Sequence, residues 1–315
     1  MRNKAPSKYF VIITLAYLLR YAECLSSANI LSVTTKQIAL TPLRAKACNE
    51  NLDMETNMKH VVNSVQKAAP KIVHELQRQG YAIIDDFLGR DVAKLYRKEA
   101  EGLYERGEMV LSQSTRWDSS SSSVLVYDKK NVLSTQLNGG EQYVESPRLH
   151  EYVVSLIQAI VPEINEKFPE AKLNPQLATN KLAVCLGEGS CYDKHFDNGG
   201  NDDLRKLTVL LYLNPSWREE LGGHFRMYLP DDHIDMGHEC AEINQDVDGF
   251  YYKDIEPRND RLLVFWSDRS IHSVQETHVV NSPEDNRFAM TVWILTSDSS
   301  AIVIDSKEVK RHFNL

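Results

Sequence analysis

Short stretches of strand-like composition follow one another from residue 181 to residue 295, and they limit the folds that this chain can adopt. Turn-forming residues separate them, as at residues 187–189 (Gly-Glu-Gly) and 198–200 (Asn-Gly-Gly). Many short strands punctuated in this way are typical of a β-sandwich or β-barrel. The strands expected from the pattern cover residues 181–186, 192–196, 206–213, 223–229, 262–266, 273–278 and 288–295.

Helical patterns precede this β-rich region. Apolar residues spaced for a single stripe predict helices over residues 91–106 and 147–160, the second with a short continuation to residue 168. A shorter helix is expected over residues 71–79, followed by a strand over residues 81–84. Helices that come before a run of strands pack on one sheet face. The sequence therefore predicts an α+β domain with N-terminal helices packed on one sheet.

The first 49 residues have the composition of a targeting segment. Arg2, Lys4 and Lys8 precede an apolar run over residues 11–19. This run is shorter than the roughly 20 residues that a spanning helix needs, and it fits the core of a signal peptide. Residues 24–49 contain no acidic residue, as is typical of organellar transit segments. We expect delivery to the secretory pathway or an organelle by a cleavable segment, with a cytoplasmic location as the alternative and membrane contact only if the run is retained.

The rest of the chain is predicted to form one domain. Residues 50–70 are polar and are interpreted as a linker, residues 71–298 as the domain, and residues 299–315 as a tail with a peripheral strand. The acidic stretch 231–253 is interpreted as a surface loop, and the serine run 119–123 as a flexible loop or a mobile lid. A net charge of −8 argues against sequence-independent binding of nucleic acid. The oligomeric state is left open.

The triplet His195-Phe196-Asp197 carries the first chemical information. In an extended strand, residues two apart project to the same side, so this imidazole and this carboxylate converge. They are two of the three ligands in the facial site that holds non-haem iron(II). A second match, His233 and Asp235, lies in the acidic stretch without a flanking strand. Because metal ligands need rigid support, His195 and Asp197 are the preferred pair.

A third ligand is expected from a distant strand, and His272 fits because it follows the apolar strand 262–266. His224, at the start of another strand, is the rival. Such a site leaves positions open for a 2-oxo acid and dioxygen. A dicarboxylate co-substrate also needs a planar donor for its distant carboxylate, and Arg287 supplies one. Thr208 and Tyr212 alternate along the strand that follows Asp197.

With these residues in place, the chain resembles the Fe(II)/2-oxoglutarate dioxygenases. Within them it is similar to the prolyl 4-hydroxylases, and most closely to the hypoxia-inducible-factor prolyl hydroxylase branch. The resemblance covers about residues 71–298 and implies a double-stranded β-helix, or jelly roll, as the core. Its supporting stretches are GYAIIDDFLG (80–89), LTVLLYLNPSW (207–217), GGHFRMY (222–228), DIEPRNDRLLVFWSDR (254–269) and RFAMTVWIL (287–295).

The resemblance also implies roles for individual residues. His195, Asp197 and His272 would ligate iron, and Arg287 with Tyr212 would bind the C5 carboxylate of 2-oxoglutarate. The remaining implied site residues are Thr208, Leu210 and Val274 as pocket lining, Trp293 as a support from the last strand, and Tyr192 at the substrate entrance. The implied cofactors are Fe(II), 2-oxoglutarate, dioxygen and L-ascorbate.

The activity implied by the resemblance is hydroxylation of a prolyl residue in a polypeptide, with release of succinate and CO₂. Two alternatives stay open: action on a small molecule or on a residue such as Lys or Asn, and a non-catalytic jelly-roll binding module. The chain also departs from the branch. Cys185 stands where the branch has a Tyr that reaches the co-substrate, and an insertion around residues 281–286 lengthens the spacing between His272 and Arg287.

Overall fold

The computed structural model describes residues 53–118, 123–200, 202–230, 243–278, 282–304 and 306–313. The expected targeting segment, most of the serine run, and the second His-x-Asp match at His233 and Asp235 lie outside these ranges. Within the ranges, no helix combines the length and the apolar character that crossing a membrane requires.

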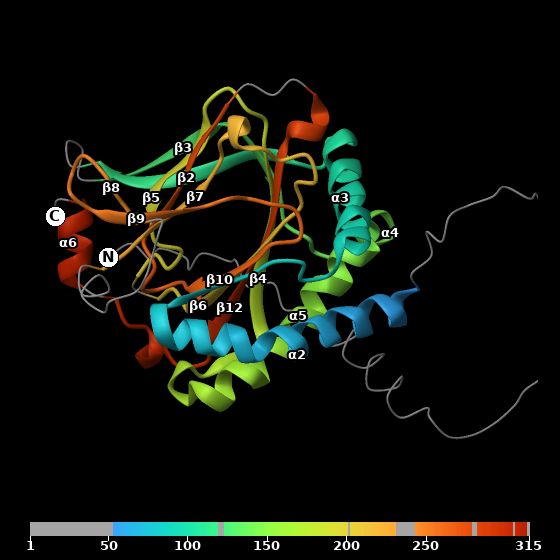
Figure 1. The fold of residues 1–315 in the computed structure, drawn as a ribbon, viewed down its shortest axis with the longest axis horizontal. Helices are drawn as coiled ribbons and strands as arrows, with labels where there is room; N and C mark the ends of the chain where they lie inside the picture. The colour runs from blue at the N-terminus through green and yellow to red at the C-terminus, as the bar shows by residue number, and fades with distance from the viewer. Residues whose placement is uncertain are drawn as a thin grey trace, which may run out of the picture.

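Two antiparallel sheets form the centre of the molecule, in agreement with the predicted jelly roll (Figure 1). The larger sheet has the order β1 (Tyr81–Ile84), β10 (Leu262–Trp266), β6 (Arg205–Tyr212), β12 (Arg287–Thr296), β4 (Leu173–Cys185), β3 (Ser123–Thr135) and β2 (Val110–Asp118). The smaller sheet has the order β5 (Ser190–His195), β11 (His272–Thr277), β7 (Phe225–Tyr228), β9 (Tyr251–Ile255) and β8 (Asn244–Gln245).

Helices cover the outer face of the larger sheet, as predicted (Figure 1). They are α2 (Met54–Gln79), α3 (Arg90–Glu105), α4 (Glu141–Glu145) and α5 (Pro147–Lys167). Short 3-10 helices occur at Pro169–Ala171, Glu219–Leu221, Pro283–Asp285 and Ser299–Ala301. The helices and this sheet face share one large apolar core.

Strand β6 is buried on both faces, and its alternation divides the helix side of the sheet from the inner side. Leu207, Val209 and Leu211 belong to the core beneath the helices. Leu210 and Tyr212 belong to a second core that lies between the two sheets. Because side chains alternate along a strand, the packing that fixes the first set also fixes the direction of the second. The inner face that carries the site is therefore held by the outer helical layer.

The linker predicted over residues 50–70 is wrong, because α2 begins at Met54 and runs without interruption to Gln79. Val61, Val65 and Ala68 are buried in its first half, which makes this segment part of the core. The polar composition of this segment conceals its apolar stripe, and the helix also contains an interior proline, Pro70. Here it lies on the exposed side of the helix, where water can satisfy the freed carbonyl.

The sequence also missed the hairpin of β2 and β3, which extends the larger sheet at one edge. Val110, Leu111 and Val126 are exposed whereas Val132 is buried, so the hairpin shows no clear alternation of buried and exposed apolar residues. The described part of the acidic stretch also differs from the predicted loop, because Asn244 and Gln245 pair with β9.

The predicted peripheral strand of the tail is a helix in the described residues. After the short helix at Ser299–Ala301, α6 covers Ser306–Phe313 and packs near the smaller sheet (Figure 1). The His312 ring stacks on Phe250 with a centroid separation of 3.9 Å, and Phe313 lies 6.0 Å from Phe196. The tail is therefore an integral part of the fold beside the His195 strand.

Candidate metal centre and co-substrate pocket

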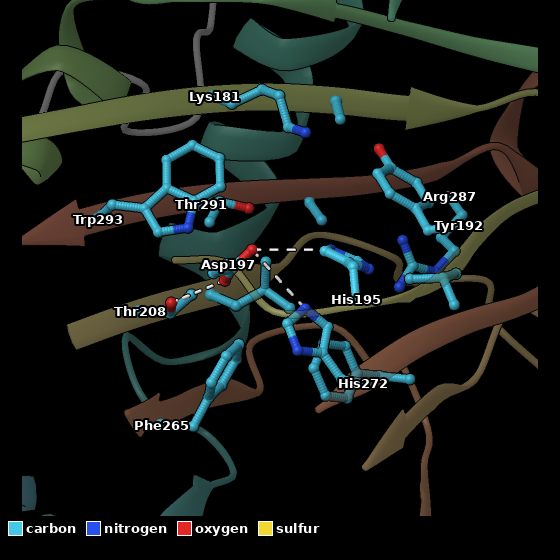
Figure 2. A pocket seen from close by; sticks show the side chains of 15 residues that line it. Lys181, Tyr192, His195, Asp197, Thr208, Phe265, His272, Arg287, Thr291 and Trp293 are labelled. Atoms are coloured by element: carbon cyan, nitrogen blue, oxygen red, sulfur yellow. Dashed lines mark hydrogen bonds and ion pairs between the residues drawn. The ribbon is translucent and has the colours of Figure 1, made fainter. Parts of the chain in front are cut away.

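His195 and His272 meet because they occupy matching positions on neighbouring strands. His195 ends β5, His272 begins β11, and the antiparallel register pairs them directly. Their ring centroids are 4.3 Å apart. Asp197 follows β5, and its Oδ1 lies 3.7 Å from the Nε2 atom of each histidine. Within the described ranges these three residues form the one group able to hold a metal ion, with ligand atoms all within 4.8 Å of one another (Figure 2).

Hydrogen bonds orient all three side chains toward a common point. The Nδ1 atom of His195 lies 2.7 Å from the carbonyl of Asp193, and that of His272 lies 2.9 Å from the carbonyl of Ser270. Donation from Nδ1 leaves the Nε2 lone pair of each ring free for a metal. Thr208 Oγ1 donates to Asp197 Oδ2 at 2.7 Å, which leaves Oδ1 facing the histidines.

The charges of the group also fit a divalent cation. Burial and the neighbouring His272 lower the pKa of His195 to about 3, and burial lowers the pKa of His272. Burial opposes ionisation of Asp197, but the two histidines and the Thr208 hydrogen bond outweigh it and lower its pKa to about 2. At neutral pH the site therefore presents two neutral imidazoles and one carboxylate, the donor set of non-haem iron(II).

A second polar feature lies at the buried end of the same pocket. Arg287, the first residue of β12, is 5% exposed and donates through Nε to the carbonyl of Gly223 at 2.7 Å. Its Nη2 atom and the hydroxyl of Tyr212 are both buried without a hydrogen-bond partner among the described residues. The Arg287 guanidinium carbon lies 5.2 Å from the centroid of the Tyr212 ring. Two buried donors without partners call for an acceptor, and the distant carboxylate of 2-oxoglutarate fits them.

A cavity of about 480 Å³ connects the metal group with Arg287. Of the residues implied by the resemblance, Tyr192, Thr208, Leu210, Val274 and Trp293 line it, and Tyr212 lies beside Arg287 without lining it. Thr208 has a further role beyond lining the pocket, because its hydroxyl holds a metal ligand. His224 is not in the group, and its ring packs against Trp217.

Sequence reasoning missed several residues that line the cavity: Lys181, Ala183, Phe225, Phe265, Ala289 and Thr291. Alternation along β12 from Arg287 would have found Ala289 and Thr291, since residues at intervals of two share a face. Lys181 has no such signal, because lysine on a strand normally faces solvent. Cys185 is buried and lies opposite Arg287 in the register of β4 and β12.

The hydroxyl of Thr208 gives a testable prediction for metal binding. Thr208→Val keeps the side-chain shape but removes the donor that holds Asp197 Oδ2, so we expect affinity for Fe(II) or Mn(II) to fall about 10- to 100-fold. Titration of the apoprotein with Mn(II) measures this change. Thr208→Ser keeps the hydroxyl and should bind like the parent. Equal Mn(II) affinity of Thr208→Val and Thr208→Ser would show that the hydroxyl does not support metal binding.

Gly223 is required by the position of Arg287. Its φ angle is +72°, and an added Cβ would lie 2.8 Å from Arg287 Cδ. Because the guanidinium would have to move, we expect Gly223→Ala to raise the KM for 2-oxoglutarate about tenfold or more while metal affinity is retained. Gly249→Ala is the matched control, since φ is +84° but the nearest atom to its Cβ is 3.8 Å away, on Gln245. A similar rise in both variants would mean that backbone strain alone is responsible.

The fold and this site together define an iron- and 2-oxoglutarate-dependent dioxygenase domain, and the comparisons with known proteins agree. Residues 181–295 match the family model described as the 2OG-Fe(II) oxygenase superfamily. This segment carries the three candidate metal ligands and is similar to that superfamily, a group of oxidoreductases, and the predicted resemblance to its prolyl hydroxylases, hypoxia-inducible-factor branch, is confirmed.

Three relatives illustrate the similarity. The chain is 28% identical to Egl nine homolog 1 of Homo sapiens over 239 residues, which cover 76% of this chain and 49% of that protein. It is 28% identical to the hypoxia-inducible factor prolyl hydroxylase of Caenorhabditis elegans over 231 residues, covering 72% of this chain and 28% of that one. The chain thus spans about half or less of the length of these curated relatives. A Trichoplax adhaerens prolyl hydroxylase, solved with a hypoxia-inducible factor peptide, shares the fold with a TM-score of 0.55 at 23% identity, over 85% of this chain and 100% of that one.

Proposed function

We propose that this chain is a peptidyl-prolyl hydroxylase that depends on Fe(II) and 2-oxoglutarate. The observation that carries the proposal is one cavity that joins the His195, Asp197 and His272 group to the unpartnered donors of Arg287 and Tyr212. Folding alone does not require buried donors without acceptors. The names of the relatives, which include prolyl hydroxylases of two animals, support a polypeptide substrate.

The protein residues have separable tasks in this reaction. Bound iron would supply the oxidative chemistry, in which dioxygen converts 2-oxoglutarate to succinate and CO₂ and one oxygen atom enters a substrate C–H bond. His195, Asp197 and His272 would hold the metal. Arg287 and Tyr212 fix the distant end of the co-substrate, so that its oxo-acid end is oriented toward the metal. Phe265, Leu210 and Val274 exclude water from the inner wall.

Two further features belong to the proposal. L-ascorbate serves as the reductant that keeps iron in the ferrous state between turnovers. Residues 1–49 direct the protein to the secretory pathway or an organelle, as their basic and apolar composition indicates.

The test is turnover of the purified protein with Fe(II), 2-oxoglutarate, ascorbate and a panel of proline-containing peptides. We expect succinate formation that depends on peptide, and a mass increase of one oxygen atom on proline. Matched peptides with Ala in place of Pro should be unmodified. Oxygen inserted at another residue or into a small molecule would replace the prolyl assignment, and failure to bind iron would identify a binding module.

A further inference from the structure

Two lysines beside the metal pocket have no polar partner among the described residues. The Nζ atom of Lys129, on β3, lies 3.7 Å from the centroid of the Tyr192 ring. The Nζ atom of Lys181, on β4, lies 5.2 Å from the same ring and 5.5 Å from the ring of Trp293. Figure 2 shows the Lys181 amine directed into the pocket. In the described part of the chain, neither ammonium has a hydrogen bond or an ion pair.

The two lysines lie on neighbouring cavities. Lys181 lines the metal pocket, whereas Lys129 lines an adjacent cavity of about 330 Å³. Both cavities are lined by Tyr192 and His195, so Tyr192 forms a wall common to them. Arg287 lines only the first cavity. A ligand that reaches both lysines must therefore extend out of the co-substrate pocket.

The other charged groups of the adjacent cavity do not neutralise this pair. Asp193 accepts a hydrogen bond from the Tyr127 hydroxyl at 2.7 Å and makes no ion pair with either lysine. Lys194 adds a third cation, with its Nζ atom 4.3 Å from the centroids of both Tyr228 and Phe250. The chain as a whole carries a net charge of −8, so this local excess of cations runs against its overall composition.

Holding the two ammonium groups here is unfavourable in the free protein. Burial, and then the charge of Lys181, lower the pKa of Lys129 to about 7, and burial lowers the pKa of Lys181. Contacts with aromatic rings and the charge of Asp197 offset part of the lost hydration, but burial remains the larger effect on both lysines. Charges that persist at such a position are characteristic of binding sites.

We propose that Lys129 and Lys181 form a carboxylate-binding subsite for the substrate, so that the preferred polypeptide carries an acidic residue close to its target proline. The inference rests on the proposed function for the identity of the target. The carboxylate belongs to the substrate because Lys129 lies on a cavity that neither Arg287 nor the ligands Asp197 and His272 line. The Tyr192 ring supplies an apolar surface between the two cations.

The test compares matched peptides on the full-length protein. Each peptide contains one proline, or alanine in its place as a control. Within a set, Asp, Asn or Lys stands in turn at each of the three positions before and the three positions after this residue. Binding is measured by fluorescence anisotropy with Mn(II) and 2-oxoglutarate present, and turnover by succinate. We expect the best Asp peptide to bind about tenfold or more tightly than its Asn counterpart. This preference should vanish in Lys181→Met and weaken in Lys129→Met, with the KM for 2-oxoglutarate unchanged.

Lys130→Met is the matched control, because Lys130 is the exposed neighbour of Lys129 on β3 and lines neither cavity. It should keep the full Asp preference. Both pocket variants should unfold at the same temperature as the parent or a higher one, since each removes a half-buried charge that has no ion pair among the described residues. Lower stability together with an unchanged Asp preference would assign the lysines a structural role and overturn the inference.

The remaining outcomes separate this inference from the proposed function. Asp preference without proline hydroxylation would uphold the subsite and reject the prolyl target. Proline hydroxylation with equal binding of Asp and Asn peptides would uphold the prolyl target and reject the subsite. A change confined to the KM for 2-oxoglutarate would place the lysines with the co-substrate and overturn the subsite.

Discussion

Asp197→Ala should abolish turnover and lower the affinity for Fe(II) by more than about 100-fold, since it removes the only anionic ligand of the metal group within the described residues. The two histidines that remain are neutral and cannot balance the charge of a divalent ion. The measurement is iron content after reconstitution, together with the rise in unfolding temperature on addition of Mn(II). A ligand that binds only the folded state produces such a rise, so the variant should lack it.

Glu276→Gln is a suitable control for this prediction. Glu276 lies on β11, the strand that begins with His272, but its side chain is exposed. Its iron content and Mn(II)-dependent stabilisation should equal those of the parent. If Asp197→Ala were to retain a full complement of iron, the facial site would have to be assigned to other residues.

Replacing Arg287 should act on the co-substrate and leave the metal in place. Removing one partner of a buried, hydrogen-bonded charge pair costs about 2–4 kcal/mol, so Arg287→Ala should raise the KM for 2-oxoglutarate roughly 30- to 700-fold. Arg287→Lys retains the charge but loses the planar fork, and we expect it to recover only part of the loss. Initial rates of succinate formation over a range of 2-oxoglutarate concentrations give the KM of each variant.

The control for Arg287 is Arg226, whose guanidinium, unlike that of Arg287, is paired with a carboxylate. Arg226 on β7 bonds both carboxylate oxygens of Asp254, at 2.8 and 2.7 Å, and does not line the pocket. Arg226→Lys should lower stability without changing the KM for 2-oxoglutarate. An unchanged KM in Arg287→Ala would instead place the distant carboxylate elsewhere.

The metal ligands could be predicted from sequence because strand geometry makes their positions interdependent. His195 and Asp197 are two residues apart beside a strand, and His272 follows a strand that is apolar throughout. The structure adds the register that brings the two histidines opposite each other. Sequence alone does not provide this register, because pairing between β5 and β11 depends on packing across the whole smaller sheet.

The features that sequence missed share a physical cause. Lys181 and the β2–β3 hairpin belong to the rim of the site, where burial is partial and hydrophobic periodicity is weak. The same weakness applies to the first half of α2, where a polar composition conceals the buried stripe of Val61, Val65 and Ala68. Core-facing periodicity therefore predicted the scaffold and its ligands, but not the groups that select a substrate.

The arrangement of His195 and His272 also ties local motion to metal content. β5 is the edge strand of the smaller sheet, and its pairing with β11 is interrupted by two register shifts. Such an edge opens more readily than a central strand, and its amide protons exchange with solvent sooner. An ion held by one residue from each strand joins them where the ladder is irregular. Because Tyr192 also lies on β5, loss of the ion would loosen the wall between the two cavities, and hydrogen exchange along β5 would report iron loading and the shape of the substrate groove together.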